Sequence, residues 1–450
     1  MRDRLAATVE RIPPLVRAIV AVLAFAGVAI WLTVTTWHNL SSSRLDIGPL
    51  TDFRDAVYYP LVALRDGVNP YAVETYYRHY PVGQEFPLYT PIHLVLHSPL
   101  LLFSFPVARA VAFGWNLALV LGYAAVVLRL IAVRLTLASV FGLGTLILLS
   151  DPGKFDLRTG QPTLMIVIAL VLALRAVATA SSARTDTAGP SAPVSFLVGV
   201  LGVVVVWSKP TFAIPLVVLL VARARSRLAV VGTAVAVGIS ALVLPLLVDA
   251  AGGIGDLIDS WQDSARITSR SGQSRLGSDL RIDAANAFVR ITRLHPSEGL
   301  ATAAGLLLLL AGAWLVYRLH RHDPTGDREE LALALVCLLV LTSMYHVPYD
   351  YLLLVVPVAM LLRPRPTRAI AWPRHARTVV ALMLLVPLVD PLGWSPVNAV
   401  LGKSGFEWMF GPTMFAVFVL TSLAICAWTA FRQLHTAPVA PPTAPLEATP

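Results

Sequence analysis

The stretch RAIVAVLAFAGVAIWLTVTTW, residues 17–37, carries no charged residue after Arg17. A helix needs about 20 mainly apolar residues to cross the hydrocarbon core of a bilayer, so this stretch predicts a membrane-spanning helix. It is longer than the apolar core of a signal peptide, which runs to about 15 residues. We therefore interpret it as a retained first span.

The composition extends this interpretation to the rest of the chain. Of the 450 residues, 56% are hydrophobic and only 14% are charged, and the mean hydropathy is +0.71. A soluble domain carries about 25% charged residues, and a chain this apolar has too little polar surface to cover water-facing cores. An ordinary soluble enzyme is therefore excluded, and we expect an all-α integral membrane protein.

Apolar segments recur along the sequence, and we expect about twelve transmembrane helices packed as a polytopic bundle. A further apolar stretch, residues 88–105, contains two prolines and two histidines, which favour a re-entrant or interfacial segment over a plain span. The twelve segments lie near residues 18–38, 108–130, 135–150, 163–178, 194–207, 210–222, 228–249, 299–318, 330–345, 349–362, 378–391 and 412–431.

The distribution of charge predicts how the helices are oriented. The 35 Lys and Arg residues exceed the 26 Asp and Glu residues, and the basic residues form short clusters at the ends of apolar runs. Such clusters face the cytoplasm and anionic lipid headgroups, so membrane lipids are expected partners and nucleic acid is not. We expect both termini in the cytoplasm, with an N-terminal segment over 1–17, a transmembrane domain over 18–432 and a disordered tail over 433–450.

Two long segments, about 39–107 and about 250–298, then fall on the extracytoplasmic side as loops. Loops of this length in a compact protein are usually functional or disordered. Both segments are rich in Asp, Arg, Trp, Tyr and Gly, and aromatic-rich sequence argues against disorder. Any chemistry is therefore expected on the outer face of the membrane.

The sequence contains no HExxH, DxD, P-loop or GxSxG motif. Metal and nucleotide dependence therefore have no support, and we expect no cofactor. Cys337 and Cys426 both fall within apolar runs, where we expect buried, inert thiols and no disulfide.

The first outer segment offers two carboxylates for acid–base chemistry. Asp52 and Asp55 are three residues apart, and such positions share one face of a helix. One interpretation is a general base for a hydroxyl group, with Tyr58 and Tyr59 close by to stack on a sugar or to exclude water. The alternative is a helix N-cap, since Asp before an amphipathic run is a common start signal.

Three more polar positions interrupt apolar sequence. Lys154 and Arg158 lie in a segment between two spans and either bind a phosphate or form local ion pairs in a solvated loop. Lys209 precedes Pro210 between two short apolar halves, which makes it a functional candidate unless it snorkels to the interface. His346 stands at the outer entrance of a span, where the alternative to a functional role is a satisfied structural donor.

The second long outer segment contains an excess of arginine, against the general rule that positive charge stays inside. Arginine on the outer side indicates anionic partners such as phosphates, although pairing with nearby aspartates would neutralise part of the charge. The arginines are Arg266, Arg270, Arg275, Arg281, Arg290 and Arg293.

In order, these elements resemble glycosyltransferase family 87, a family of membrane-embedded GT-C enzymes, over roughly residues 15–365. Two departures are Thr163, where the family often has Asn, and Val347, where the family has a second histidine. The resemblance rests on Asp52-Phe53, Tyr58-Tyr59, the G-x-N-P-Y element at 67–71, Pro91, Pro99, Trp115, Gly160-Gln161, Lys209-Pro210, the RSGQS run at 270–274 and His346.

The resemblance implies a GT-C-like bundle in a bacterial plasma membrane that transfers a sugar from a polyprenyl-phosphate donor, with mannose the first expectation and another hexose or a pentose the alternatives. The acceptor would be a hydroxyl of a glycolipid or polysaccharide on the extracytoplasmic face, and the reaction a metal-independent inverting displacement. Asp52 or Asp55 would be the base. The donor phosphate would bind Lys209, His346, Arg266, Arg270, Arg275, Lys154 or Arg158. The sugar and acceptor would bind Tyr58, Tyr59, Asn69, Tyr71, Gln161 or Gln273.

Two other classes of protein share some of these features. A lipid or solute transporter, such as a flippase, also uses about twelve spans, broken helices and buried charges. Against it, the two halves of the chain show no convincing internal repeat, and charged residues collect in the outer segments rather than at mid-span. A structural factor for envelope polymers, without catalysis, is separated from an enzyme only by activity.

Overall fold

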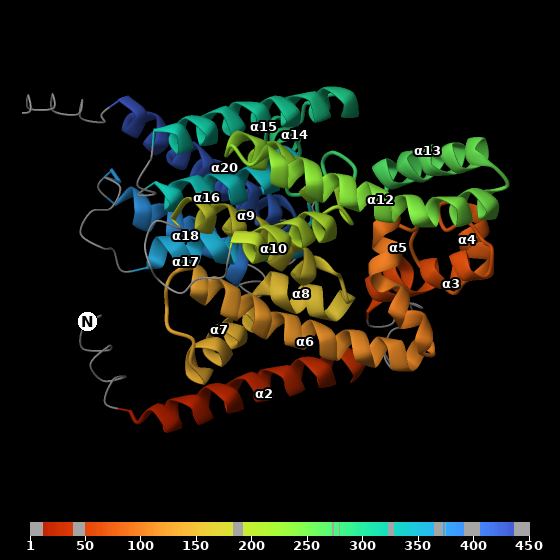
Figure 1. Ribbon diagram of the computed structural model, residues 1–450, viewed down its shortest axis with the longest axis horizontal. Coiled ribbons are helices and arrows are strands. Elements are labelled where there is room, and N and C mark those ends of the chain that lie inside the picture. Colours follow the sequence, from red (N-terminus) through yellow and green to blue (C-terminus); the bar gives the residue numbers. More distant parts are fainter. Residues whose placement is uncertain are drawn as a thin grey trace, which may run out of the picture.

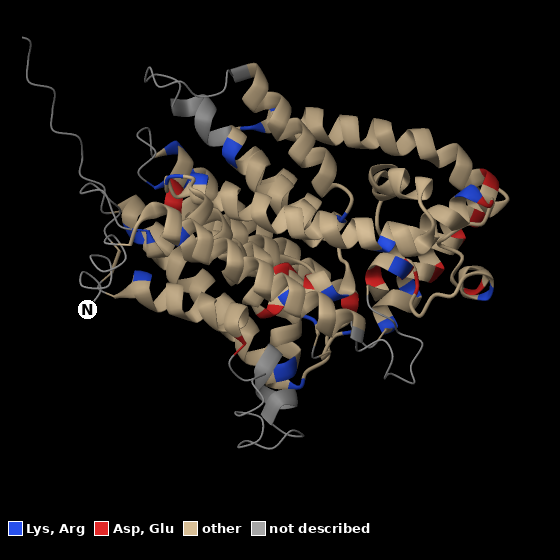
Figure 2. Cartoon of the chain, turned by 90° about the horizontal axis from the view of Figure 1, so that it is seen from below, with Lys and Arg blue, Asp and Glu red and all other residues tan. Residues whose placement is uncertain are grey.

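The computed structural model is built from helices alone among the residues that it describes. This confirms the all-α expectation. Figure 2 shows long helical stretches without charge, with charged residues gathered at helix ends and in connecting segments. The described residues are 12–38, 50–182, 192–271, 274–278, 280–322, 328–363, 372–373, 375–390 and 406–435.

Five of the helices are long and apolar enough to cross a membrane. Each contains at least 23 residues in its candidate span, which exceeds the roughly 20 residues that a bilayer requires. The chain is therefore a membrane protein by the length and composition of its helices. The five are α2 (Pro14–His38), α6 (Phe105–Leu130), α12 (Ser226–Ala251), α15 (Glu298–Arg321) and α20 (Phe406–His435).

The other seven apolar segments expected as spans are helical as well. Their described apolar stretches are shorter, so a crossing by all twelve remains a prediction. They form α7 (Leu137–Leu149), α9 (Thr163–Ser182), α10 (Ala192–Val206), α11 (Pro210–Ala222), α16 (Glu329–Ser343), η3 (Pro348–Leu354) with α17 (Val355–Leu362), and α18 (Ala376–Val389).

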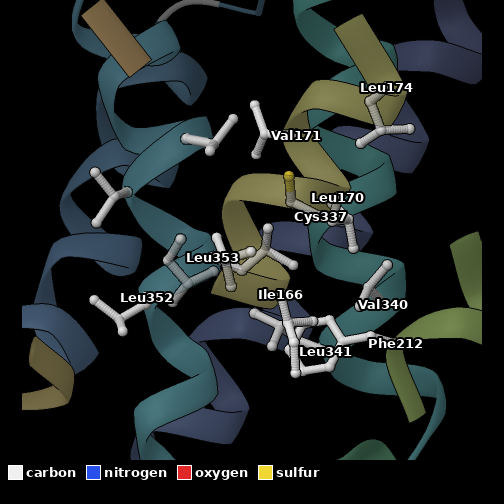
Figure 3. Close-up of a cluster of buried hydrophobic side chains, with 14 of the residues drawn as sticks. Ile166, Leu170, Val171, Leu174, Phe212, Cys337, Val340, Leu341, Leu352 and Leu353 are labelled. Carbon is white, nitrogen blue, oxygen red and sulfur yellow. The ribbon is translucent and has the colours of Figure 1, made fainter. Parts of the chain in front are cut away.

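The main core lies where α9, α11, α16 and η3 meet (Figure 3). Every residue of α16 from Leu331 to Ser343 is buried, so this helix is surrounded by protein on all sides. Cys337 lies in this core, and both it and Cys426 are free, buried thiols, as expected from their apolar surroundings. Figure 1 shows α2 and α15 along opposite edges of the bundle.

The two long segments expected as loops contain helices in their described parts. The helices of the first segment and the helix over 254–270 gather at one end of the molecule with the end of α12 (Figure 1), whereas the helix over 284–292 packs against α15 and α20. A second, smaller core forms there, in which Tyr76 and Phe86 pack against Leu247 and Leu257. The helices are η1 (Phe53–Tyr58), α3 (Tyr59–Arg65), α4 (Val73–His79), α5 (Pro91–His97), η2 (Ser98–Leu102), α13 (Ile254–Arg270) and α14 (Ala284–Thr292).

The stretch 88–105 does not form one straight helix, because α5 and η2 meet at Ser98 and each begins with a proline in its first turn. A helix broken at Ser98 is compatible with the predicted re-entrant or interfacial segment, which stays a prediction. The segment 149–165, expected as a loop, is instead the helix α8 (Asp151–Thr159). Ser150 caps it by accepting a hydrogen bond from the backbone N–H of Gly153 at 3.1 Å.

Candidate functional site

The site begins at η1, the helix that carries both candidate carboxylates. Asp52 occupies the N-cap position of η1, but its side chain makes no capping hydrogen bond. The capping interpretation of Asp52 is therefore wrong in this structure. Asp52 and Asp55 both line one cavity of about 310 Å³, as their spacing on one helix face predicts. Arg54 and Gln84 line it as well, and we call it the polar cavity for these four side chains.

Two side-chain amides hold Asp52 in place. Gln84 Nε2 donates to Oδ1 and Gln161 Nε2 donates to Oδ2, each at 2.5 Å. The Tyr89 hydroxyl donates to Gln161 Oε1 at 3.1 Å. Burial raises the pKa of Asp52, and the hydrogen bonds from the two amides oppose that rise. Burial therefore makes Asp52 a stronger base, and its two neutral partners do not compensate its negative charge.

The connection from α8 to α9 brings Gln161 to Asp52. The helix α8 ends at Gly160, whose φ of +72° lies in the left-handed region. A Cβ at this position would lie 2.7 Å from Phe53 Cβ and 2.9 Å from Leu50 Cδ2. Only glycine therefore allows α8 to pass so close to η1.

Asp55 has a different environment from Asp52, although the two share the cavity. Arg54 Nε lies 2.5 Å from Asp55 Oδ1, and its Nη2 lies 3.1 Å from Oδ2. The backbone N–H of Gly83 also donates to Oδ2 at 3.1 Å. Burial raises the pKa of Asp55, while the Arg54 guanidinium lowers it. An adjacent cation thus compensates the charge of Asp55.

A second cavity, of about 370 Å³, lies on the other face of η1 and is mainly apolar. Phe53 and Val57 line it from η1, and Trp115 lines it from α6. Gln161 also lines this apolar cavity while it donates to Asp52 in the wall of the polar one. The contact between Gln161 and Asp52 therefore stands at the border between an apolar and a polar space.

Lys209 and His346 come together on a shared carboxylate, Asp350. Lys209 Nζ lies 2.7 and 2.9 Å from the two oxygens of Asp350, and His346 Nδ1 lies 2.9 Å from Oδ2. Lys209 is only 6% exposed, and the other two side chains are fully buried. The snorkelling interpretation of Lys209 is therefore wrong. The ring of Tyr349, which lines the polar cavity, lies 5.0 Å from Lys209 Nζ.

The tyrosines and the asparagine that were expected to bind sugar make hydrogen bonds and aromatic contacts within the protein. The Tyr58 hydroxyl donates to the carbonyl of Phe103 at 2.9 Å, and Tyr59 packs in the same aromatic cluster. Asn69 Oδ1 accepts the N–H of Tyr71, whose own hydroxyl donates to the carbonyl of Tyr89. None of these four side chains is among the lining of the two described cavities. Gln273 lies outside the described residues.

The remaining expected phosphate ligands do not line either described cavity. Lys154 is 3.6 Å from Asp151, as the ion-pair alternative predicted, and Arg158 is exposed beside it on α8. Arg266 pairs with Asp263 at 2.8 Å on the surface of α13. Arg270 and Arg275 are exposed, and neither lines the two described cavities.

Four residues of the site were not among the expected ligands. Arg54, Gln84 and Tyr89 lie in the first outer segment, where only their closeness in sequence to the two aspartates could have marked them. Asp350 stands four residues after His346, a spacing that puts two side chains on one helix face. Within the part of the chain that the structure describes, no group of three His, Cys, Asp or Glu side chains could hold a metal ion.

Comparison with known proteins adds one finding. A sequence model described as glycosyltransferase family 87 matches residues 87–343, more than half of the chain. The matched region contains Tyr89, Gln161 and Lys209, whereas Asp52 precedes it and Asp350 follows it. No curated protein and no solved structure matches the chain.

Proposed function

Because the chain belongs to glycosyltransferase family 87 and is a membrane glycosyltransferase, we propose that it moves a sugar from a polyprenyl-phosphate donor to a hydroxyl group of a glycolipid or polysaccharide. The proposed sugar is a hexose, with mannose first and a pentose as the alternative. The proposed location is the outer face of a bacterial plasma membrane, with both termini in the cytoplasm. The positive-inside distribution of arginine supports this orientation.

The single observation that supports this class of donor is that the two faces of η1 line two different cavities. Its polar face, with Asp52 and Asp55, lines the polar cavity, and its apolar face, with Phe53 and Val57, lines the apolar one. A polyprenyl-phosphate sugar has the same two parts, a polar sugar phosphate and an apolar chain. Such a donor would place its chain beside Phe53 and its sugar beside Asp52, on the two sides of one short helix.

Asp52 is the proposed general base. It would take the proton of the acceptor hydroxyl while the hydroxyl oxygen attacks the anomeric carbon of the donor. The bond between that carbon and the phosphate oxygen breaks, the electron pair leaves with polyprenyl phosphate, and the configuration inverts. Asp55 is the weaker candidate because Arg54 already compensates its charge.

The leaving phosphate gains negative charge and needs fixed cations or donors to stabilise it. Arg54 is the guanidinium that lines the polar cavity, and we add it to the proposed phosphate ligands. Lys209 lies beside the ring of Tyr349, and Lys209 and His346, which share Asp350, remain proposed ligands. The exposed cations of α8 and α13 are more distant candidates.

The test is transfer by purified protein in detergent or liposomes. Radiolabelled polyprenyl-phosphate sugars and a membrane lipid extract should yield a labelled glycolipid or polysaccharide without any nucleotide sugar. Transfer that occurs only from a nucleotide sugar would contradict the proposed donor class. Movement of the labelled lipid across the liposome membrane without a covalent product would instead indicate a transporter.

A further inference from the structure

Three side chains from three separate segments form a line of hydrogen bonds that ends at the proposed base. Tyr89 donates to Gln161 Oε1, and Gln161 Nε2 donates to Asp52 Oδ2. The three side chains are 5%, 3% and 9% exposed, so water does not compete strongly for these bonds. Tyr89 itself does not reach Asp52 by a hydrogen bond and can act on it only through the amide.

The direction of the amide decides which form of Asp52 it favours. With Nε2 toward Asp52, Gln161 donates to the carboxylate and stabilises the charged, basic form. With the amide turned over, Oε1 would face Asp52 and could accept a hydrogen bond only from the protonated acid. The Tyr89 hydroxyl opposes this turn, because its proton would lose Oε1, its acceptor, and stay buried, even though the hydroxyl oxygen could accept an N–H of the turned amide.

We propose that Tyr89 is a positioning residue that locks the Gln161 amide with its N–H group toward Asp52 and so keeps the base ready to accept a proton. The inference rests on the proposed role of Asp52 as the base. It assigns Tyr89 no contact with the sugar or the acceptor.

The other amide on Asp52 is held less firmly. Gln84 comes from an irregular segment between α4 and α5, is partly exposed, and lines the polar cavity. Its bond to Asp52 Oδ1 is therefore the one that an acceptor hydroxyl can replace. Gln161 keeps Oδ2 occupied throughout, which makes its direction matter during the proton transfer.

Several other groups set the proton affinity of Asp52, and a substitution of Tyr89 leaves their charges unchanged. Asp55 stands on the same helix and raises the pKa of Asp52, and Arg54 pairs with Asp55. The hydroxyl of Thr159 on α8 donates to the carbonyl of Phe155. The groups that face Asp52 from other elements are Asp156, Thr159, Gln84, Gln161, Tyr89, Tyr345 and Tyr349.

The test compares the pH dependence of kcat/KM for Tyr89→Phe with that of wild type. Loss of the hydroxyl lets the amide turn when Asp52 is protonated, so the pKa of the base rises. The acid limb of the profile should move to higher pH by about half to one unit, the equivalent of one hydrogen bond. Turnover on the plateau, where the base is already deprotonated, should stay within a few-fold of wild type.

Tyr123→Phe is the matched control. Its hydroxyl is fully buried and donates to the carbonyl of Leu352 at 2.7 Å, and neither Tyr123 nor Leu352 lines the two described cavities. It loses a buried tyrosine hydrogen bond without touching Asp52, so its acid limb should coincide with that of wild type. A Tyr89→Phe protein with equal losses at all pH values, or with an unmoved limb, would overturn the inference.

Gln161→Met gives a second, independent measurement. This variant keeps the volume of the side chain but removes the donor to Asp52, so its acid limb should also move to higher pH. Adding Tyr89→Phe to it should then cause no further movement, because Tyr89 acts through the amide. An unmoved limb in Gln161→Met, or additive shifts in the double variant, would overturn the inference. Full activity of Asp52→Asn would instead show that the proposed base itself is wrong.

Discussion

Asp52 and Asp350 are both buried, yet they are held in opposite ways. Asp350 is fully buried on η3, with Lys209 on both of its oxygens and His346 on one, and the N–H of Val347 donates to it as well. Asp52 lies in the wall of a cavity, and its two side-chain hydrogen-bond partners are neutral amides. One carboxylate is matched by the Lys209 cation, and the other has no cation among its hydrogen-bond partners.

The difference distinguishes a structural carboxylate, Asp350, from a reactive carboxylate, Asp52. A buried carboxylate matched by a cation joins the segments that carry the two groups, here the start of α11 and η3, and gains little from taking up a proton. A buried carboxylate held by amides keeps its negative charge only against the cost of desolvation, so it accepts a proton readily. The cavity beside Asp52 gives a substrate hydroxyl access to that group.

The largest expected effect follows from removing the charge of Asp52. Asp52→Asn keeps the size of the side chain and an oxygen that can accept one of the two amides. General base catalysis contributes about 10²–10⁴-fold, so turnover should fall by at least about 100-fold while expression and donor binding remain normal. The measurement is initial rate of sugar transfer together with binding of the polyprenyl-phosphate donor.

Asp55→Asn is the matched control for this prediction. It removes the other carboxylate of the same cavity and leaves Arg54 without its bidentate partner, so we expect a smaller loss than for Asp52→Asn. An active Asp52→Asn protein beside an inactive Asp55→Asn protein would exchange the two roles. Full activity of both variants would show that neither aspartate is the base.

The second prediction concerns the ion pair between Lys209 and Asp350. Lys209→Met leaves the charge of Asp350 buried without its main cation, which typically costs about 3–5 kcal/mol of folding free energy. Lys209→Met combined with Asp350→Leu removes both charges and should recover most of the thermal stability. We expect its transfer rate to stay at least about tenfold below wild type, because Lys209 is also a proposed phosphate ligand.

A double variant that transfers sugar at the wild-type rate would show that Lys209 has no role in binding the donor phosphate. Lys209 would then serve Asp350 alone, and the cations at the leaving phosphate would have to be sought in Arg54 or in the exposed arginines of α13. A double variant no more stable than Lys209→Met would show that the pair with Asp350 is not what holds α11 and η3 together.

The same two aspartates show what the sequence can and cannot predict. The helical segments follow from runs of apolar residues that are local in sequence, and the shared face of Asp52 and Asp55 follows from their spacing. Their partners do not, because Gln161 is 109 residues from Asp52 and Asp350 is 141 residues from Lys209. An isolated lysine in apolar sequence therefore predicted a functional cation, whereas the fold supplies it with a carboxylate.

The tyrosines near the base show another limit of the sequence. Tyr58, Tyr59 and Tyr71 are aromatic residues close to the base in sequence, which favoured a sugar-binding platform, and that role stays a prediction. In the structure Tyr58 and Tyr71 donate to backbone carbonyls, and Tyr59 packs against Phe105. Tyr89, which the sequence did not distinguish from them, is the tyrosine whose hydroxyl meets the amide on Asp52.

The smallest expected effect is that of removing divalent metal. The oxygens of Asp55 are occupied by Arg54 and by the N–H of Gly83, and those of Asp52 by two amides, so an ion would have to displace several donors to bind between them. Neither carboxylate oxygen of Asp156 has a hydrogen-bond partner among the described residues, but burial raises the pKa of Asp156 well above its usual value, and a protonated carboxyl is a poor ligand. Transfer rates should therefore be the same, within error, before and after dialysis against EDTA.

Loss of transfer on chelation, restored by magnesium or manganese, would mean that metal binding deprotonates Asp156. A third aspartate, Asp156, would then be more important for transfer than Asp52 or Asp350.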